Sequence, residues 1–173
     1  MCPPAPAAAA PPPSSPGRLV AACISSATPA ADRRRVMRAV AQNMGACFPQ
    51  AWSPRAASNR SALIRLGVLD AVVLLQDGGG GRVAASCTLV HREEFGTCEM
   101  QDVCVRPELR GQGLCGRLAR ASLAHLRRAG GVRELHVFCH RSNAAACRCY
   151  AGVFGAPVHT TPDTTAFVKR LKP

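Results

Sequence analysis

Three closely spaced glycines mark the part of this sequence that is best suited to chemistry. They stand in the segment RGQGLCG, residues 110–116, between an apolar run that ends at Val105 and an amphipathic run that begins at Leu114. Glycine tolerates positive φ angles and lets a ligand approach the backbone closely. The first turn of a helix also offers unpaired N–H groups and a partial positive charge. The segment therefore predicts a loop that holds a phosphate or diphosphate, with Arg110 and Arg117 adding charge-assisted hydrogen bonds.

The segment does not meet all the requirements of two well-known phosphate-binding loops, the P-loop and the dinucleotide-binding loop. A P-loop needs a lysine after its last glycine, and the only lysines of the chain are Lys169 and Lys172. Residues 111–116 do match the G-x-G-x-x-G spacing of a dinucleotide-binding loop, but that loop also needs an acidic residue ~20 positions later. Glu134 is the only nearby acid, and the segment follows an expected antiparallel meander instead of opening a parallel sheet. Both assignments therefore lack a residue or a context that they require.

The elements around this loop alternate between strand and helix patterns. Strands are expected at residues 18–25, 70–76, 82–90, 96–107, 133–139, 156–161 and 165–171, and helices at 31–48, 53–67, 114–129 and 143–154. Thr28 and Asp32 are candidate N-caps for the first helix, and Asp77 with the following glycines predicts a hairpin turn. The order β-α-α-β-β-β-α-β-α-β-β predicts a mixed α/β (α+β) domain in which a meander leads into one βαβ unit.

A second motif follows the glycine loop in the segment VFCHRSNAAACRCY, residues 137–150. Together the two segments resemble the GNAT superfamily, the acetyl-CoA-dependent N-acetyltransferases, and the likeness extends from about residue 18 to residue 171. The family's Q/R-x-x-G-x-G/A core falls on Arg110, Gly113 and Cys115, where a cysteine replaces the usual small residue. Its later asparagine and tyrosine fall on Asn143 and Tyr150.

The resemblance implies a single N-acetyltransferase domain at residues 18–173 with a mixed sheet of about seven strands. Two parallel strands, near residues 103–105 and 137–139, would splay apart, and pantetheine would hydrogen-bond to the exposed strand edge. The N–H of Val103 would polarise the thioester carbonyl. The cofactor-binding residues implied in this way are Val103, Cys104, Val105, Arg110, Gly111, Gln112, Gly113, Leu114, Cys115, Gly116, Asn143 and Ala146.

The same resemblance suggests two catalytic residues. Tyr150, the only tyrosine of the chain, falls where the family keeps a general acid; the alternative is an aromatic residue packed in the core. Glu99 is a candidate base, because on a regular strand it shares a face with Val103 and Val105; the alternative is a surface residue. Asp102 would point to the opposite face and serve a structural role.

Composition limits the possible partners. Lys and Arg number 22 against 10 Asp and Glu, a net charge of +12 that favours an anionic partner. Aromatic residues make up only 4% of the chain and its arginines are scattered, which argues against a nucleic-acid-binding module. The ten cysteines show no C-x-x-C pair, so we expect reduced thiols, no disulfide framework and no metal site.

The N-terminal residues 1–17 are rich in proline and alanine and predict a disordered tail without a secretion signal. No apolar run reaches the ~18–20 residues of a membrane span. These features predict a cytoplasmic protein, with a nuclear location left open, that is a monomer or a homodimer. Its expected function is transfer of an acetyl group from acetyl-CoA to a primary amine of a small molecule or protein. The alternative is a degenerate member that binds coenzyme A or a protein partner without catalysis.

Overall fold

The computed structural model describes residues 18–48, 54–76 and 82–171. The tail expected at residues 1–17 and the hairpin turn expected after Gln76 lie outside these residues. The elements are β1 (Leu19–Ile24), α1 (Ala30–Cys47), α2 (Pro54–Arg65), β2 (Leu69–Gln76), β3 (Val83–Arg92), η1 (Glu93–Phe95), β4 (Thr97–Val105), η2 (Pro107–Leu109), α3 (Leu114–Ala129), β5 (Glu134–His140), α4 (Ala144–Phe154), β6 (His159–Thr160) and β7 (Thr164–Arg170).

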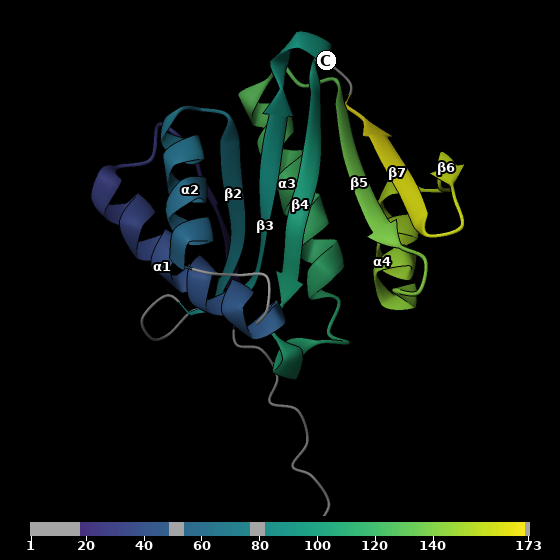
Figure 1. Cartoon of the computed structure of the whole chain (residues 1–173), viewed down its shortest axis with the longest axis horizontal. Coiled ribbons are helices and arrows are strands. Elements are labelled where there is room, and N and C mark those ends of the chain that lie inside the picture. Colours follow the sequence, from purple (N-terminus) through teal and green to yellow (C-terminus); the bar gives the residue numbers. More distant parts are fainter. Residues whose placement is uncertain (1–17, 49–53, 77–81, 172–173) are drawn as a thin grey trace, which may run out of the picture.

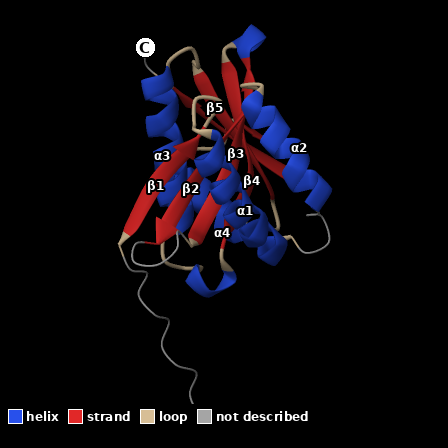
Figure 2. Ribbon diagram, turned by 90° about the vertical axis from the view of Figure 1, so that its left-hand side faces the viewer, coloured by secondary structure: helices blue, strands red, loops and turns tan. Residues whose placement is uncertain are grey.

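The strands form one seven-stranded sheet in the order β1-β2-β3-β4-β5-β7-β6 (Figure 1). The pair β4 and β5 is parallel, and the other neighbouring pairs are antiparallel. Figure 2 shows α2 and α3 on opposite sides of this sheet. The mixed α/β fold, the element order and the closing β6–β7 hairpin confirm the sequence prediction.

The two faces of the sheet carry separate apolar cores. On one face α3 and α4 pack on the sheet around Leu118, Leu126 and Phe167. On the other face α1 and α2 pack around Val40, Met44 and Ile64. Leu, Val, Cys and Ala side chains fill most of both cores, as the low aromatic content requires.

The parallel pair is joined along only part of its length. β4 pairs with β5 from Thr97–Glu134 to Met100–Val137, although β4 continues to Val105 and β5 to His140. Beyond Met100 the two strands diverge, which is visible at the lower end of β4 in Figure 1. The splayed pair implied by the resemblance is therefore present.

A β-bulge interrupts β4 at the point where the strands separate. The β3–β4 register shifts between Thr88–Gln101 and Ser86–Cys104, and Asp102 there adopts a φ of 50°. A bulge places two residues opposite one, so the alternation of side chains changes phase across it. The residues before and after Asp102 therefore follow different patterns.

The start of α1 differs from the prediction. Pro29 occupies the N-cap position and no side chain caps the helix. Thr28 Oγ1 instead accepts a hydrogen bond from the Ser25 N–H at 3.0 Å, and Asp32 lies in the first turn. A threonine hydroxyl can accept a hydrogen bond from a nearby turn as well as from the first turn of a helix. In this structure the hydroxyl of Thr28 bonds within the turn.

The expectation that all cysteines are free thiols is wrong. Disulfides join Cys47 to Cys104 and Cys115 to Cys149. Each bridge links two elements that only the tertiary fold brings together, α1 with β4 and α3 with α4. The free cysteines among the described residues are Cys23, Cys87, Cys98, Cys139 and Cys147. None of the helices that the structure describes is both long and apolar enough to cross a bilayer.

Candidate active site

A cavity of about 740 Å³ lies where β4 and β5 separate. Its walls come from the end of β4, the glycine loop, the start of α3, α4 and the end of α1. The predicted residues that line it are Val103, Cys104, Val105, Arg110, Gly111, Gly113, Leu114, Cys115, Gly116, Asn143, Ala146 and Tyr150. Gln112 and Glu99 are not among its lining residues. The structure thus brings both sequence motifs to one cavity.

The glycine loop and the first turn of α3 line this cavity through Gly111, Gly113 and Gly116. Gly111 and Gly113 have φ angles of 79° and 71°, in the left-handed region that favours glycine. Gly113 is the N-cap of α3, and no side chain caps the helix. Within the described residues, no protein group accepts a hydrogen bond from the amides of residues 111–116. These donors are available to an anion at the positive end of α3.

Gln112 is placed differently from its neighbours. Its side chain is half-buried, and the buried Oε1 atom has no hydrogen-bond partner among the described residues. Gln112 therefore differs from Gly111 and Gly113, which line the cavity.

Three arginines supply positive charge to the cavity. Arg110, Arg120 and Arg148 line it, and the Arg110 Nε also donates to the Val105 carbonyl at 3.3 Å. Arg117 does not line the cavity, because its Nη2 donates to the Leu19 carbonyl of β1 at 3.4 Å. The expectation that Arg117 adds to the phosphate site is therefore wrong, because its place on the helical turn directs it to the other side of α3.

Sequence reasoning missed Arg120 and Arg148 as cavity residues. Arg120 lies one helical turn after Gly116, and residues four apart share a face of a helix. The four-residue spacing between Gly116 and Arg120 is therefore a sequence signal that could have identified Arg120. Arg148, by contrast, depends on how α4 is seated beside α3, which the sequence does not indicate.

Tyr150 lies on α4 between the cavity and the core. Its side chain is 3% exposed and makes edge-on contacts with Phe154 at 6.0 Å and Phe167 at 5.9 Å between ring centroids. Burial raises the pKa of the phenol above its usual value, so the hydroxyl is protonated at neutral pH. The two interpretations of Tyr150 are compatible, since the ring packs in the core and the residue also lines the cavity.

Asn143 begins α4. Its Oδ1 accepts a hydrogen bond from the Ala146 N–H at 3.1 Å, which caps the helix and satisfies one of its free amides. The motif therefore fixes the start of the helix that carries Tyr150.

Glu99 does not share a face with Val103 and Val105, and that prediction is wrong. Its neighbours Cys98 and Met100 pack into the same core as Val103 and Val105, on the α3/α4 face. By alternation Glu99 points to the α1/α2 face. The bulge at Asp102 reverses the pattern that a regular strand would have maintained.

Asp102 has a structural role on the α1/α2 face. Its Oδ2 is 2.6 Å from the guanidinium of Arg60 on α2 and accepts from Thr88 Oγ1 at 2.9 Å. This ion pair ties α2 to the bulge in β4.

Comparisons with known proteins agree with this geometry. Residues 37–156 match the family model described as the acetyltransferase (GNAT) family. A search of curated proteins by sequence finds no match.

Solved structures show the same fold at low sequence identity. The ribosomal-protein-S18-alanine N-acetyltransferase from Escherichia coli aligns with a TM-score of 0.66 at 18% identity, covering 89% of this chain and 96% of that one. A putative acetyltransferase from Acinetobacter baylyi gives 0.67 at 11%, covering 89% and 94%. RimL, a ribosomal L7/L12 alpha-N-protein acetyltransferase in complex with coenzyme A, gives 0.62 at 11%, covering 83% and 91%. Because the family model spans more than half of the sequence, this chain belongs to the GNAT family of acetyltransferases.

Proposed function

We propose that this protein transfers the acetyl group of acetyl-CoA to a primary amine of a small molecule or a protein, through one N-acetyltransferase domain at residues 18–173. One observation carries the proposal. Unpaired loop amides, the edge of a splayed strand and the buried Tyr150 surround a single cavity of about 740 Å³. These are the parts needed to hold a diphosphate, to orient a thioester and to supply a proton.

The diphosphate of coenzyme A binds the amides of residues 112–116, and Arg110, Arg120 and Arg148 add positive charge around it. The pantetheine arm runs along Val103 to Val105, where β5 no longer pairs with β4. The Val103 N–H donates to the thioester carbonyl oxygen and stabilises the negative charge that develops there.

Tyr150 acts as the general acid. The amine nitrogen forms a bond to the acetyl carbon, the C–S bond breaks, and the thiolate takes the phenolic proton. Proton transfer from a phenol with a pKa of ~10 or above to a thiolate near ~8.5 is uphill, so proximity has to provide the benefit. Burial keeps Tyr150 protonated for this step.

Glu99 accepts the amine proton, directly or through a water molecule. It lies on the α1/α2 face, opposite the face on which the loop holds the diphosphate. An acceptor that enters from the α1/α2 side would pass Glu99 on its way to the gap that opens after Met100. Asp102 is unsuited to this task because it is paired with Arg60.

The similar structures whose names specify ribosomal proteins favour a protein amine as one class of acceptor to test, alongside small-molecule amines. We place the protein in the cytoplasm, as a monomer or homodimer.

Calorimetry with acetyl-CoA, followed by mass spectrometry of a panel of amines and peptides incubated with it, tests the proposal. Saturable 1:1 binding and a mass increase of one acetyl group on an acceptor are expected. Absence of heat and of a thermal shift at millimolar acetyl-CoA would reject the proposal, and binding without any acetylated product would favour the non-catalytic alternative. Mass detection is preferable to a thiol reagent because the chain has ten cysteines.

A further inference from the structure

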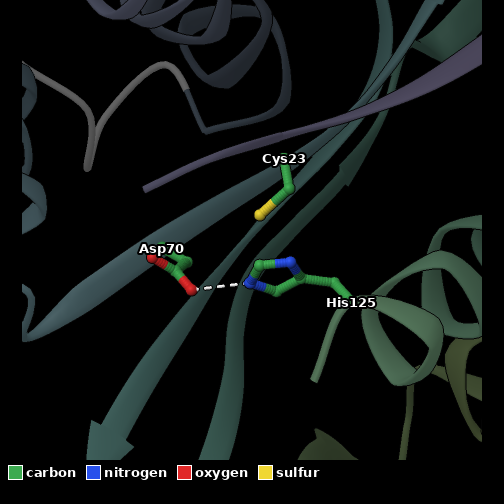
Figure 3. Close-up of side chains that lie close together, drawn as sticks. All are labelled: Cys23, Asp70 and His125. Atoms are coloured by element: carbon green, nitrogen blue, oxygen red, sulfur yellow. Dashed lines mark hydrogen bonds and ion pairs between the residues drawn. The ribbon is translucent and has the colours of Figure 1, made fainter. Parts of the chain in front are cut away.

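A second cluster of reactive side chains lies between the sheet and α3, away from the cofactor cavity. Cys23 on β1, Asp70 on β2 and His125 on α3 point toward one another (Figure 3). One ligand atom from each, the thiol sulfur, a carboxylate oxygen and an imidazole nitrogen, all lie within 4.8 Å of one another. None of the three lines the cavity, and His125 is about 16 Å along α3 from Leu114 at a rise of ~1.5 Å per residue.

The cluster is sheltered and its carboxylate is held in place. The side chains of Asp70 and His125 are 10% and 15% exposed, and the Asp70 Oδ2 is 2.7 Å from the His125 Nε2. His91 on β3 places its Nε2 3.1 Å from the same oxygen. A carboxylate only accepts hydrogen bonds, so both imidazoles direct Nε2–H groups at Asp70.

The thiol of Cys23, the carboxylate of Asp70 and the imidazole of His125 are three of the ligand types that zinc prefers. Zn²⁺ binds thiolate sulfur at ~2.3 Å and imidazole nitrogen or carboxylate oxygen at ~2.0–2.2 Å, usually in a tetrahedron. Such a tetrahedron places neighbouring donor atoms roughly 3.3–3.7 Å apart. The 2.7 Å contact between Asp70 and His125 would have to open by under ~1 Å, and the wider separations up to 4.8 Å would have to close.

We propose that Cys23, Asp70 and His125 bind a divalent cation of the zinc class, with His91 as a positioning residue that holds the Asp70 carboxylate. Ligating carboxylates are commonly hydrogen-bonded in this way by a neighbouring group. Three protein ligands leave the fourth position of a tetrahedral ion to water. The ion would join β1, β2 and α3, three elements that are distant in sequence.

In the metal-free cluster the carboxylate is charged and the thiol is neutral. Burial acts to raise the pKa of Asp70, but hydrogen bonds from His125 and His91 outweigh it and lower the pKa to about 2, so the carboxylate is charged. Burial and the Asp70 charge raise the pKa of Cys23 to about 12, while Arg128 acts in the opposite direction. The free thiol is therefore protonated at neutral pH, and binding of the cation through the thiolate releases that proton to solvent. Ligation by the His125 Nε2 replaces its hydrogen bond to Asp70 and requires the neutral imidazole to carry its proton on Nδ1 instead.

Cobalt titration of the metal-stripped full-length protein tests this site directly. Co²⁺ bound to a thiolate gives a charge-transfer absorption in the near ultraviolet, and we expect one equivalent to bind and Zn²⁺ to displace it. A cation that binds only the folded state stabilises it, so Zn²⁺ at a hundredfold excess over its Kd should raise the unfolding midpoint by about 5–10 °C.

The variants identify the ligands. Cys23→Ser should remove the charge-transfer band, and His125→Gln should weaken cobalt binding at least ~10-fold. Cys147→Ser is the matched control, because the sulfurs of Cys147 and Cys139 lie 3.0 Å apart and form the obvious competing thiol pair. All three variants should still bind acetyl-CoA, which shows that they fold and keeps this test independent of the transferase proposal.

Two outcomes would overturn the proposal. The first is absence of stoichiometric cobalt binding, in which case Asp70 and its histidines form only a structural hydrogen-bond cluster. The second is a band that persists in Cys23→Ser. If Cys147→Ser abolishes that persisting band, the cobalt is bound at the Cys139–Cys147 pair instead.

Discussion

A hollow of similar size lies at each end of the parallel strand pair, but the two hollows differ in how far their hydrogen-bonding groups are paired within the protein. At the splayed end the cavity beside the glycine loop, proposed above to hold acetyl-CoA, measures about 740 Å³. At the other end a hollow of about 640 Å³, here called the opposite hollow, is lined by Thr97, Glu134 and the C-terminal end of α3 among other residues. Volume alone therefore does not distinguish a binding site in this protein.

Several charged and backbone groups of the opposite hollow are paired within the protein. β4 and β5 are paired there, the Arg133 side chain donates to the Phe95 carbonyl at 2.9 Å, and Glu134 is bonded to His136 at 3.1 Å and to Arg170 at 3.2 Å. At the splayed end the strands have separated and the loop amides have no protein partner among the described residues. A hollow becomes a site where the fold leaves hydrogen-bonding groups without internal partners.

The largest expected effect comes from the two glycines that flank α3. Gly113 at the splayed end and Gly130 at the opposite hollow both have positive φ angles, 71° and 73°, and open space where a Cβ would lie. We expect Gly113→Val to weaken acetyl-CoA binding by ~10³-fold, because at least three charge-assisted hydrogen bonds of about 1.5 kcal/mol each are disturbed. Calorimetry provides the Kd.

Gly130→Val is its control. A branched side chain at either positive φ costs at least ~1–2 kcal/mol of stability, so both variants should unfold at lower denaturant concentration. Only Gly113→Val should lose affinity for acetyl-CoA. Equal affinities in the two variants would contradict the assignment of the diphosphate to the loop.

Tyr150→Phe should lower kcat by ~10²-fold and leave the Kd for acetyl-CoA within about threefold, because the phenylalanine ring preserves the packing and removes only the acidic proton. Steady-state rates with an identified acceptor, together with calorimetry, provide both values. If the variant is as fast as the parent protein, Tyr150 has no part in proton transfer.

Arg120→Ala should weaken acetyl-CoA binding by ~10-fold, as expected for one partly exposed charge-assisted contact. Arg127→Ala on the same helix changes the charge equally but lies at the opposite hollow, so its Kd should match that of the parent. A similar loss in both variants would show that net charge attracts the ligand and that the position of Arg120 is irrelevant.

The smallest effect is spectroscopic. Because Tyr150 is the only tyrosine, tyrosinate absorbance reports its ionisation alone, and we expect little ionisation in the folded protein at pH 10, where free tyrosine is half ionised. A phenol whose pKa is raised on folding stabilises the protein below pH ~10 and loses that contribution as the pH rises further. Tyr150→Phe should therefore unfold at a higher pH than the parent. A normal tyrosine titration would place the phenol in solvent.

Much of the fold and of the candidate site could be predicted because the signals are local. The glycines of residues 111–116 act through their own φ angles and the adjacent helix start, and Asn143 caps the helix that it precedes. Hydrophobic periodicity likewise reports on each element separately. The predicted cofactor-binding residues accordingly line one cavity, except Gln112, which is not among its lining residues.

Errors arose where the outcome depends on distant parts of the chain. A regular strand would place Glu99 on the same face as Val103, but the register of β3 against β4 imposes a bulge that reverses the alternation between them. Arg117 and Arg120 differ in the sides of α3 that they occupy, which depends on whether β1 or α4 packs there.

By itself the sequence determined the element order, the glycine loop and the helix that carries Tyr150, because short-range backbone preferences and side-chain periodicity suffice for them. Tertiary structure alone decided the disulfides Cys47–Cys104 and Cys115–Cys149, the face of Glu99 and the meeting of Cys23, Asp70 and His125. Each of these depends on strand register or helix docking, and those are set by packing between segments that no local pattern connects.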